Sequence, residues 1–243
     1  MADVSTVVVV VLLGAAAFFY TLGGFAGGSV FIAILLAASV PAGQAALAGL
    51  VFNTVSTSSS ILRWRIHFSR EMLWFVAGSV PMAFVGGLLY VPDELLRRVM
   101  GVAILVGGFT VLTATFQLKK VYLGIPARVL VGCGIGLLAG LTGIGGGVYL
   151  APLLIMLDIA NPKTTAATTT TLILLNSLAG ILARLPRLPT LLPNPVILAA
   201  ISLIILTAQL GSYTGAKLFS QKTVRRVIAS LLISIGLFLS LGA

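Results

Sequence analysis

Two long apolar stretches of this chain are each broken by a cluster of glycines and closed by a proline. The first is GGFAGGSVFIAILLAASVP at residues 23–41, and the second is GLTGIGGGVYLAPLLIMLDIANP at residues 140–162. A helix-length segment follows each proline and ends in arginine, at the same distance from the proline in both copies. The chain therefore contains a duplicated unit, and glycine is expected to interrupt the regular backbone of each copy.

The composition indicates the solvent in which this unit folds. Only 8% of the residues are charged and 59% are hydrophobic, with a mean hydropathy of +1.17, whereas soluble domains carry about 25% charged residues. We therefore predict a polytopic helical protein embedded in a lipid bilayer. No basic face or aromatic platform accompanies the net charge of +10, so we expect no nucleic-acid partner. Asp3 precedes the first apolar run without any Lys or Arg, which argues against a cleaved signal peptide.

Ten apolar segments follow one another, at residues 5–22, 28–40, 44–62, 72–90, 97–116, 127–142, 147–157, 164–183, 194–216 and 224–242. The second and the seventh are shorter than the roughly 20 residues that a spanning helix needs. Each follows a glycine cluster, so we expect each to be the second arm of a re-entrant hairpin. The predicted fold is an all-α polytopic membrane protein with two inverted repeats, each a re-entrant helical hairpin plus three transmembrane helices. The first repeat is 1–118 with hairpin 5–40, and the second is 119–243 with hairpin 127–157.

The basic residues test this topology. With re-entrant hairpins, one side of the membrane receives eleven of them: Arg63, Arg65, Arg70, Lys119, Lys120, Arg128, Lys163, Lys217, Lys222, Arg225 and Arg226. The other side receives four: Arg97, Arg98, Arg184 and Arg187. If each broken stretch crossed once, the split would be eight and seven. Because cytoplasmic loops carry the excess of Lys and Arg, we predict a multi-pass protein of a prokaryotic cytoplasmic membrane with both termini outside the cytoplasm. The count alone does not separate a re-entrant hairpin from two full crossings.

The glycine breaks would place free backbone N–H groups inside the membrane. Such backbone persists only where protein or a water-filled cavity covers it. The second arms begin near Ser29 and Val148, and helix N-termini bind anions. In the alternative interpretation these glycines only let helices pack closely.

Polar side chains follow each break at helical spacing. Thr165, Thr169 and Asn176 lie within about 40° of one another on a helix, and Asn53, Thr57 and Ser60 form a comparable row. Such groups also bond their own backbone or brace a neighbouring helix. The predicted substrate-binding residues are Gly24, Gly27, Gly28, Ser29, Asn53, Thr57, Thr142, Gly143, Gly145, Gly146, Gly147, Thr165, Thr169 and Asn176.

Several kinds of chemistry are disfavoured by what the sequence lacks. The five acidic residues all fall at predicted loops or segment ends, which disfavours cation transport. The single His67 and the single Cys133 offer neither a metal site nor a nucleophile–base pair, so we expect no metal, no cofactor and no enzymatic activity. Arg63 and Arg184 end equivalent helices; each could attract anions or extend to the interface, and we favour the second.

Taken together, these motifs resemble the TauE/SafE family of sulfite and organosulfonate exporters over nearly the whole chain. In the second copy TGIGGG, a proline five residues on and ATTTT match the family pattern, whereas in the first copy Ala26 and Ala33 depart from it. The resemblance implies transport of a small anion such as sulfite.

We therefore predict a secondary transporter that works by alternating access, with the lipid bilayer and a small inorganic or organic anion as its partners. An anion channel with the same site and a membrane subunit of a larger complex remain alternatives, and homodimerisation is left open.

Overall fold

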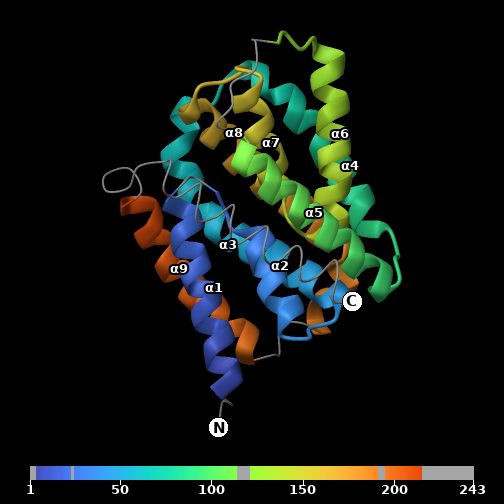
Figure 1. Ribbon diagram of the computed structural model, residues 1–243, viewed down its shortest axis with the longest axis vertical. Coiled ribbons are helices and arrows are strands. Elements are labelled where there is room, and N and C mark those ends of the chain that lie inside the picture. Colours follow the sequence, from blue (N-terminus) through green and yellow to red (C-terminus); the bar gives the residue numbers. More distant parts are fainter. Residues whose placement is uncertain (1–3, 23–24, 114–120, 191–194, 215–243) are drawn as a thin grey trace.

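The computed structural model describes residues 4–22, 25–113, 121–190 and 195–214, and within these ranges all regular structure is helical (Figure 1). The α-helices are α1 (Val4–Leu22), α2 (Gly28–Ala37), α3 (Ala42–Trp64), α4 (Leu73–Leu88), α5 (Asp93–Thr113), α6 (Ile125–Thr142), α7 (Gly147–Met156), α8 (Pro162–Ala183) and α9 (Pro195–Thr214). Short 3-10 helices cover Arg65–His67, Arg70–Met72 and Leu185–Thr190. The all-helical prediction is confirmed, while the predicted helix 224–242 and Gly24 lie outside the described residues.

Helix lengths agree with a multi-pass membrane protein. Five helices of the described part are long and apolar enough to span a bilayer: Ala42–Leu62, Arg70–Leu88, Ile125–Thr142, Lys163–Ala183 and Val196–Thr214. In contrast, α2 and α7 have ten residues each. At 1.5 Å per residue each measures about 15 Å, half of the roughly 30 Å hydrocarbon core. The prediction that these two segments are too short to cross is therefore confirmed.

The helices pair across the sequence. In Figure 1, α1 lies along α9 at the lower left and α4 lies along α6 at the upper right, while α3 contacts α8. Each outer pair joins a helix from residues 1–118 with a helix from residues 119–243. The two halves of the sequence consequently do not form separate bodies.

The pairing of α4 and α6 depends on small residues. A Cβ atom on Gly132, Gly136 or Gly140 of α6 would collide with a carbonyl oxygen of α4. These three glycines recur every four residues and so line one face of α6. Small residues at this spacing let two membrane helices approach backbone to backbone.

The end of each short helix accepts a hydrogen bond from another part of the chain. At the end of α2, the Leu36 carbonyl accepts a hydrogen bond of 3.0 Å from Arg97, in the first turns of α5. At the end of α7, the Leu157 carbonyl accepts one of 3.1 Å from the backbone N–H of Val121, in the connection from α5 to α6. Both short helices are followed by a residue with positive φ, Ser39 at 60° and Asp158 at 50°.

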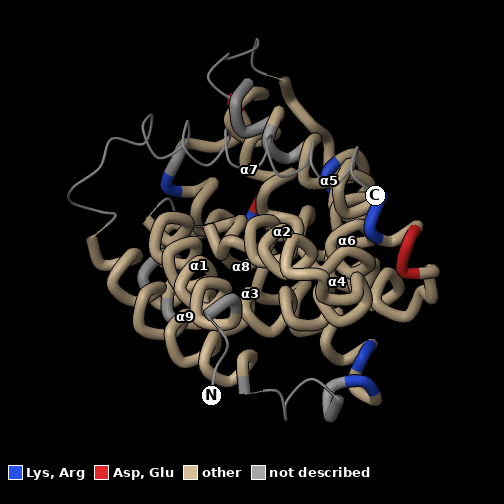
Figure 2. Tube along the Cα trace, turned by 60° about the horizontal axis from the view of Figure 1, so that its bottom comes forward, with Lys and Arg blue, Asp and Glu red and all other residues tan. Residues whose placement is uncertain are grey.

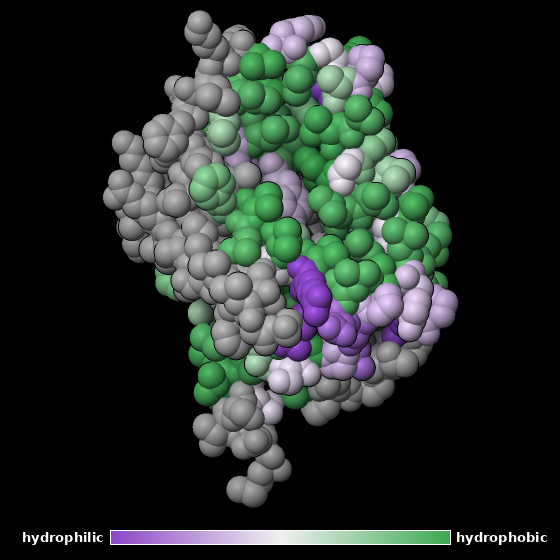
Figure 3. Space-filling model, turned by 45° about the vertical axis from the view of Figure 1, so that its right-hand side comes forward, coloured by the Kyte–Doolittle hydropathy of each residue, from purple (hydrophilic) through white to green (hydrophobic). Residues whose placement is uncertain are grey.

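Charge and hydropathy are distributed as a bilayer requires. Figure 2 shows Lys, Arg, Asp and Glu at the ends of helices, and in Figure 3 hydrophobic side chains cover most of the described face while hydrophilic ones gather in one band. Large apolar side chains such as Phe109, Leu130 and Leu206 are more than 60% exposed. The described carboxylates lie at helix starts or turns, as predicted.

Candidate functional site

Both glycine breaks have the same backbone conformation where the short helix begins. Gly27 precedes α2 with φ of 97°, and Gly146 precedes α7 with φ of 89°. The second break contains two further positive-φ glycines, Gly143 at 79° and Gly145 at 88°. Glycine adopts this left-handed region readily because it has no Cβ atom. In both copies the regular helix is interrupted at the glycine cluster, as the sequence predicted.

The N-termini of α2 and α7 are buried without a side-chain cap. Neither Gly27 nor Gly146 offers a capping side chain, and the first N–H groups of a helix have no partner within it. Ser29 in the first turn of α2 is 2% exposed, and Val148 in the first turn of α7 is 8% exposed. The fold therefore places two positive helix-dipole ends in its interior.

The N-terminus of α2 lies against the second break. A Cβ atom on Gly28 would collide with the Ile144 carbonyl oxygen and would lie 2.5 and 2.6 Å from the amide nitrogen and oxygen of Asn53. Asn53, from α3, donates its amide N–H to the Gly143 carbonyl at 3.1 Å. One side chain thus contacts both breaks.

The long helix after each hairpin also provides a polar side chain that donates a hydrogen bond to the backbone of the break. In the second break, Asn176 of α8 donates to the Gly145 carbonyl at 3.3 Å and to Ser79 Oγ at 2.8 Å. In the first break, Ser56 of α3 donates to the Ala26 carbonyl at 3.1 Å. Ser56 stands as far into α3 as Asn176 stands into α8. Ser56 was not among the predicted site residues, although aligning the starts of the two helices places it opposite Asn176.

The matching contact to the short helix differs in chemistry. The Asn53 amide lies against Gly28, the first residue of α2, whereas the Ile173 side chain lies against Gly147, the first residue of α7. Ile173 also lines Gly145, where an added Cβ would be 2.9 Å from its Cγ2. Beside the first residue of the short helix, the first half-site therefore presents an amide and the second an alkyl group.

The predicted threonines and the serine are buried, and their hydroxyls bond locally. Hydroxyl groups donate from Thr57 to Asn53 O (2.6 Å), from Thr142 to Leu138 O (2.6 Å), from Thr165 to Ala160 O (3.4 Å) and from Thr169 to Thr165 O (2.9 Å). Thr169 Cβ lies 3.7 Å from where Gly147 would carry a Cβ, so this threonine borders the second break. The Ser29 hydroxyl lies 3.5 Å from the Tyr20 hydroxyl.

Four buried side-chain atoms of the described part have no hydrogen-bond partner there. They are Asn53 Oδ1, Asn176 Oδ1, Tyr149 OH and Ser177 Oγ. Two of the four belong to the amides that hold the breaks. Both amides use the nitrogen on a backbone carbonyl and leave the oxygen unpaired.

Arg184 does not extend to the interface, and that expectation was wrong. Its side chain turns inward and donates to the carbonyl oxygens of Gly140 (2.6 Å) and Leu141 (3.0 Å), at the C-terminal end of α6. The residue is 4% exposed. Burial, together with the nearby charge of Arg187, lowers the pKa of the guanidinium to about 10, so it stays charged at neutral pH. The carbonyl end of α6 attracts this cation, and the side chain of Arg63 lies outside the described residues.

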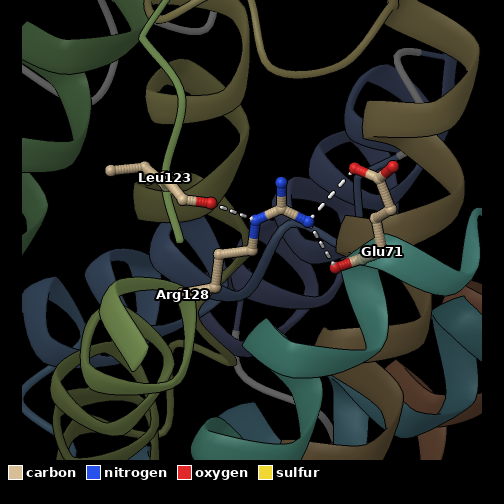
Figure 4. A network of polar contacts seen from close by, with 3 residues as sticks. All are labelled: Glu71, Leu123 and Arg128. Carbon is tan, nitrogen blue, oxygen red and sulfur yellow. Dashed lines mark hydrogen bonds and ion pairs between the residues drawn. The ribbon is translucent and has the colours of Figure 1, made fainter. Parts of the chain in front are cut away.

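A second buried arginine joins the two halves of the chain. Figure 4 shows Arg128, near the start of α6, between Leu123 and Glu71. Its guanidinium donates to the Leu123 carbonyl at 2.8 Å and to the Glu71 carbonyl and carboxylate at 3.1 and 3.2 Å. From the sequence, Arg128 was only one of the eleven basic residues assigned to one side of the membrane. In the structure it links α6 to the connection from α3 to α4.

A cavity of about 440 Å³ opens between α1, α2, α3 and α9. Its lining contains Leu35, Ser39, Gln44, Ala48 and Ile197. Ala48 precedes Gly49, where an added Cβ would lie 3.1 Å from the Gly143 carbonyl oxygen. The lining therefore comes within one residue of the contact between α3 and the second break. Within the described part, no three residues among His, Cys, Asp and Glu gather as metal ligands.

Comparison with known proteins gives a consistent result. Residues 8–239 match the family model for the sulfite exporter TauE/SafE. A curated relative, the probable membrane transporter protein y4hK of Sinorhizobium fredii (strain NBRC 101917 / NGR234), is 28% identical over 183 residues, which cover 72% of this chain and 70% of the relative. No solved structure matches.

Proposed function

The chain belongs to the sulfite exporter TauE/SafE family, as its motifs predicted, and on this basis we propose that it is a secondary transporter of a small anion. The anion would be a sulfur oxyanion or an organosulfonate such as sulfite, moved across the cytoplasmic membrane. A relative named as a probable membrane transporter supports the general activity. The choice of an anion rests on the site.

The observation that carries this choice is that the buried, uncapped N-terminus of α2 lies against the second break, from which the uncapped helix α7 begins. Each N-terminus acts like roughly half a positive charge, so the two together could offset about one negative charge. The described residues near the breaks include no carboxylate to repel an anion. The charged Arg184 at the end of α6 adds a positive potential near the second break. A monoanion fits this charge best.

Paired features of the fold support two inverted repeats. Gly27 matches Gly146, and Ser39 matches Asp158, in sequence position and in backbone conformation. In the pair α1–α9, the first arm of the first hairpin packs on the second long helix after the second hairpin. In the pair α4–α6, the first arm of the second hairpin packs on the second long helix after the first hairpin. In inverted hairpins the end of α2 would lie on the outer side, beside Arg97 near the start of α5, and the end of α7 on the cytoplasmic side, beside Val121 shortly before α6. Repeats at 1–118 and 119–243 would then surround the site, with both termini outside the cytoplasm.

Alternating access would have to move these pairs relative to each other, since each pair mixes the two repeats. The cavity between α1, α2, α3 and α9 opens beside the end of α2, which the proposed topology assigns to the outer side. We infer that this cavity is part of the outer access route. The Arg128–Glu71 link lies at the opposite, cytoplasmic end of that topology.

The test is transport by the purified protein in proteoliposomes. Labelled sulfite outside vesicles loaded with unlabelled sulfite should accumulate transiently, and saturation by external sulfite would identify a carrier. Single-channel currents carried by the same anion would instead identify a channel. Purified, folded protein that neither binds nor moves sulfite, sulfonates, thiosulfate or carboxylates would contradict the proposal and favour a subunit of a larger complex.

A further inference from the structure

The amide of Asn53 contacts both breaks. It lies against Gly28 at the start of α2, and an added Cβ on Gly145 would be 2.9 Å from its nitrogen. The residue is fully buried, with an exposed fraction of 0%. Any anion held by the N-terminus of α2 would therefore lie next to this side chain.

The hydrogen bonds fix which atom of the amide is free. The Gly143 carbonyl can only accept a hydrogen bond, so the amide nitrogen of Asn53 must face it, and the distance of 3.1 Å confirms this bond. The oxygen is left without a partner in the described part of the chain. It lies 2.6 Å from the position of a Cβ on Gly28, beside the free N–H groups of the first turn of α2.

A buried acceptor without a partner is costly, and it must face whatever occupies the site. An anion that only accepts hydrogen bonds would satisfy the N–H groups of α2 but would repel Asn53 Oδ1. An anion that also carries an O–H or N–H group would satisfy both. Beside the first residue of α7 the matching position holds the alkyl side chain of Ile173, and the unpaired amide oxygen of the second break belongs instead to Asn176, which lies against Gly146.

Given the proposed function, on which this inference rests, we propose that Asn53 selects anions that carry their own hydrogen-bond donor. This class contains monoprotonated oxyanions such as hydrogen sulfite, and sulfonates with a hydroxyl or amino group near the sulfur. The ligand's sulfonate oxygens accept from the N–H groups of α2, and its O–H or N–H donates to Asn53 Oδ1. The amide would thus fix the orientation of the anion between the breaks.

Matched sulfonates test the proposal on the unmodified protein. Hydroxymethanesulfonate and ethanesulfonate have the same number of heavy atoms and the same charge, and they differ in one hydroxyl. Calorimetric titration of the purified protein should give about tenfold tighter binding for hydroxymethanesulfonate, the scale expected for leaving a buried acceptor unpaired. The pair 2-hydroxyethanesulfonate and propane-1-sulfonate repeats the comparison with the hydroxyl one carbon further away.

Two variants assign the effect to Asn53. Asn53→Leu should bring the affinity ratio of the first pair close to one, whereas Thr54→Val should keep it, because the Thr54 hydroxyl donates to the Leu50 carbonyl of its own helix. If Asn176→Leu removed the ratio and Asn53→Leu did not, the assignment to Asn53 would be wrong. If Asn53→Leu did not fold, the affinity ratios of the two sulfonate pairs for the unmodified protein would still show whether the site prefers an anion with a hydrogen-bond donor.

The possible failures are distinguishable. Measurable binding of both members of each pair with equal affinity would overturn the inference and leave anion transport intact; the free oxygen would then face water. Absence of binding for every sulfonate and for hydrogen sulfite would reject the proposed function and the inference together.

Discussion

The first and second breaks enter their short helices with the same backbone conformation but have different side chains around it. Both enter a ten-residue helix through a left-handed glycine, and both are held by a polar side chain of the next long helix. At the first residue of the short helix, the amide of Asn53 contacts the first break and the alkyl group of Ile173 contacts the second. Both copies of the duplicated unit therefore start a short helix with an uncapped N-terminus inside the protein, while individual side chains differ in the groups that they present to a ligand.

The second break is also the more constrained of the two. It contains three positive-φ glycines, whereas the described part of the first contains one. A Cβ atom on its Gly146 would have Ile135, Leu172 and Asn176 as nearest neighbours, whereas the three atoms nearest to a Cβ on Gly27 all belong to the Phe31 ring. We therefore expect substitutions in the second break to have the larger effects.

The largest expected effect concerns the sides to which the two hairpins return. Ser39 and Asp158 follow α2 and α7, are exposed and match in backbone conformation. In a Cys133→Ser background, Ser39→Cys should react fully with an impermeant thiol reagent added outside intact cells, and Asp158→Cys should not react until the membrane is permeabilised. Equal labelling of both positions from one side would show that the hairpins are not inverted.

The next effect compares the two left-handed glycines. Gly146→Leu should abolish anion uptake and lower the free energy of unfolding by about 2–5 kcal/mol, because leucine disfavours positive φ and no space surrounds the site. Gly27→Leu should cost about 1–3 kcal/mol, since the Phe31 ring can move. Thermal unfolding in detergent and uptake into proteoliposomes measure both.

Gly134→Leu is the control for these glycine variants. Nothing lies within 4 Å of a Cβ at Gly134, which is on the same hairpin. It should unfold at the same or a higher temperature, because glycine is a poor helix former. Normal uptake by Gly146→Leu would mean that the second glycine cluster serves packing alone.

A smaller difference in stability is expected between variants of the two side chains that donate hydrogen bonds to carbonyl oxygens of the breaks. Asn176→Ala should lower the free energy of unfolding by about 2–3 kcal/mol, because Gly145 O and Ser79 Oγ both lose a donor. Ser56→Ala should cost about 1 kcal/mol, since one bond to Ala26 is lost. Ser202→Ala on α9, whose exposed hydroxyl bonds its own helix, should change stability by less than about 0.5 kcal/mol. If Ser56→Ala lowered the free energy of unfolding more than Asn176→Ala did, the first break would be the more constrained of the two.

The smallest effect concerns the proline that distinguishes α7 from α2. Pro152 lies inside α7, and Ala33 occupies the matching position in α2. Pro152→Ala would restore the missing N–H of α7 and should change the free energy of unfolding by less than about 1 kcal/mol, with uptake retained. A loss of uptake at unchanged stability would show that the proline shapes the second half-site.

Much of the local structure follows from the sequence. The predicted second arms, 28–40 and 147–157, begin where α2 and α7 begin and end within three residues of them. Lipid cannot satisfy free backbone groups, so apolar runs must form helices, and glycine clusters must break them. The hydroxyl rows were a weaker guide, because buried threonines such as Thr57 and Thr165 donate to nearby backbone carbonyls.

By itself, then, the sequence determined the helices, the two breaks, the membrane environment and the family, all of which depend on local patterns of hydropathy and glycine. Only the tertiary structure decided that α2 begins against the second break, that Asn53 bonds Gly143 across 90 residues, and that Arg184 turns inward to the end of α6. The reason is physical: a buried polar group takes whatever partner the packing of distant helices brings within reach. No pattern of neighbouring residues specifies that partner.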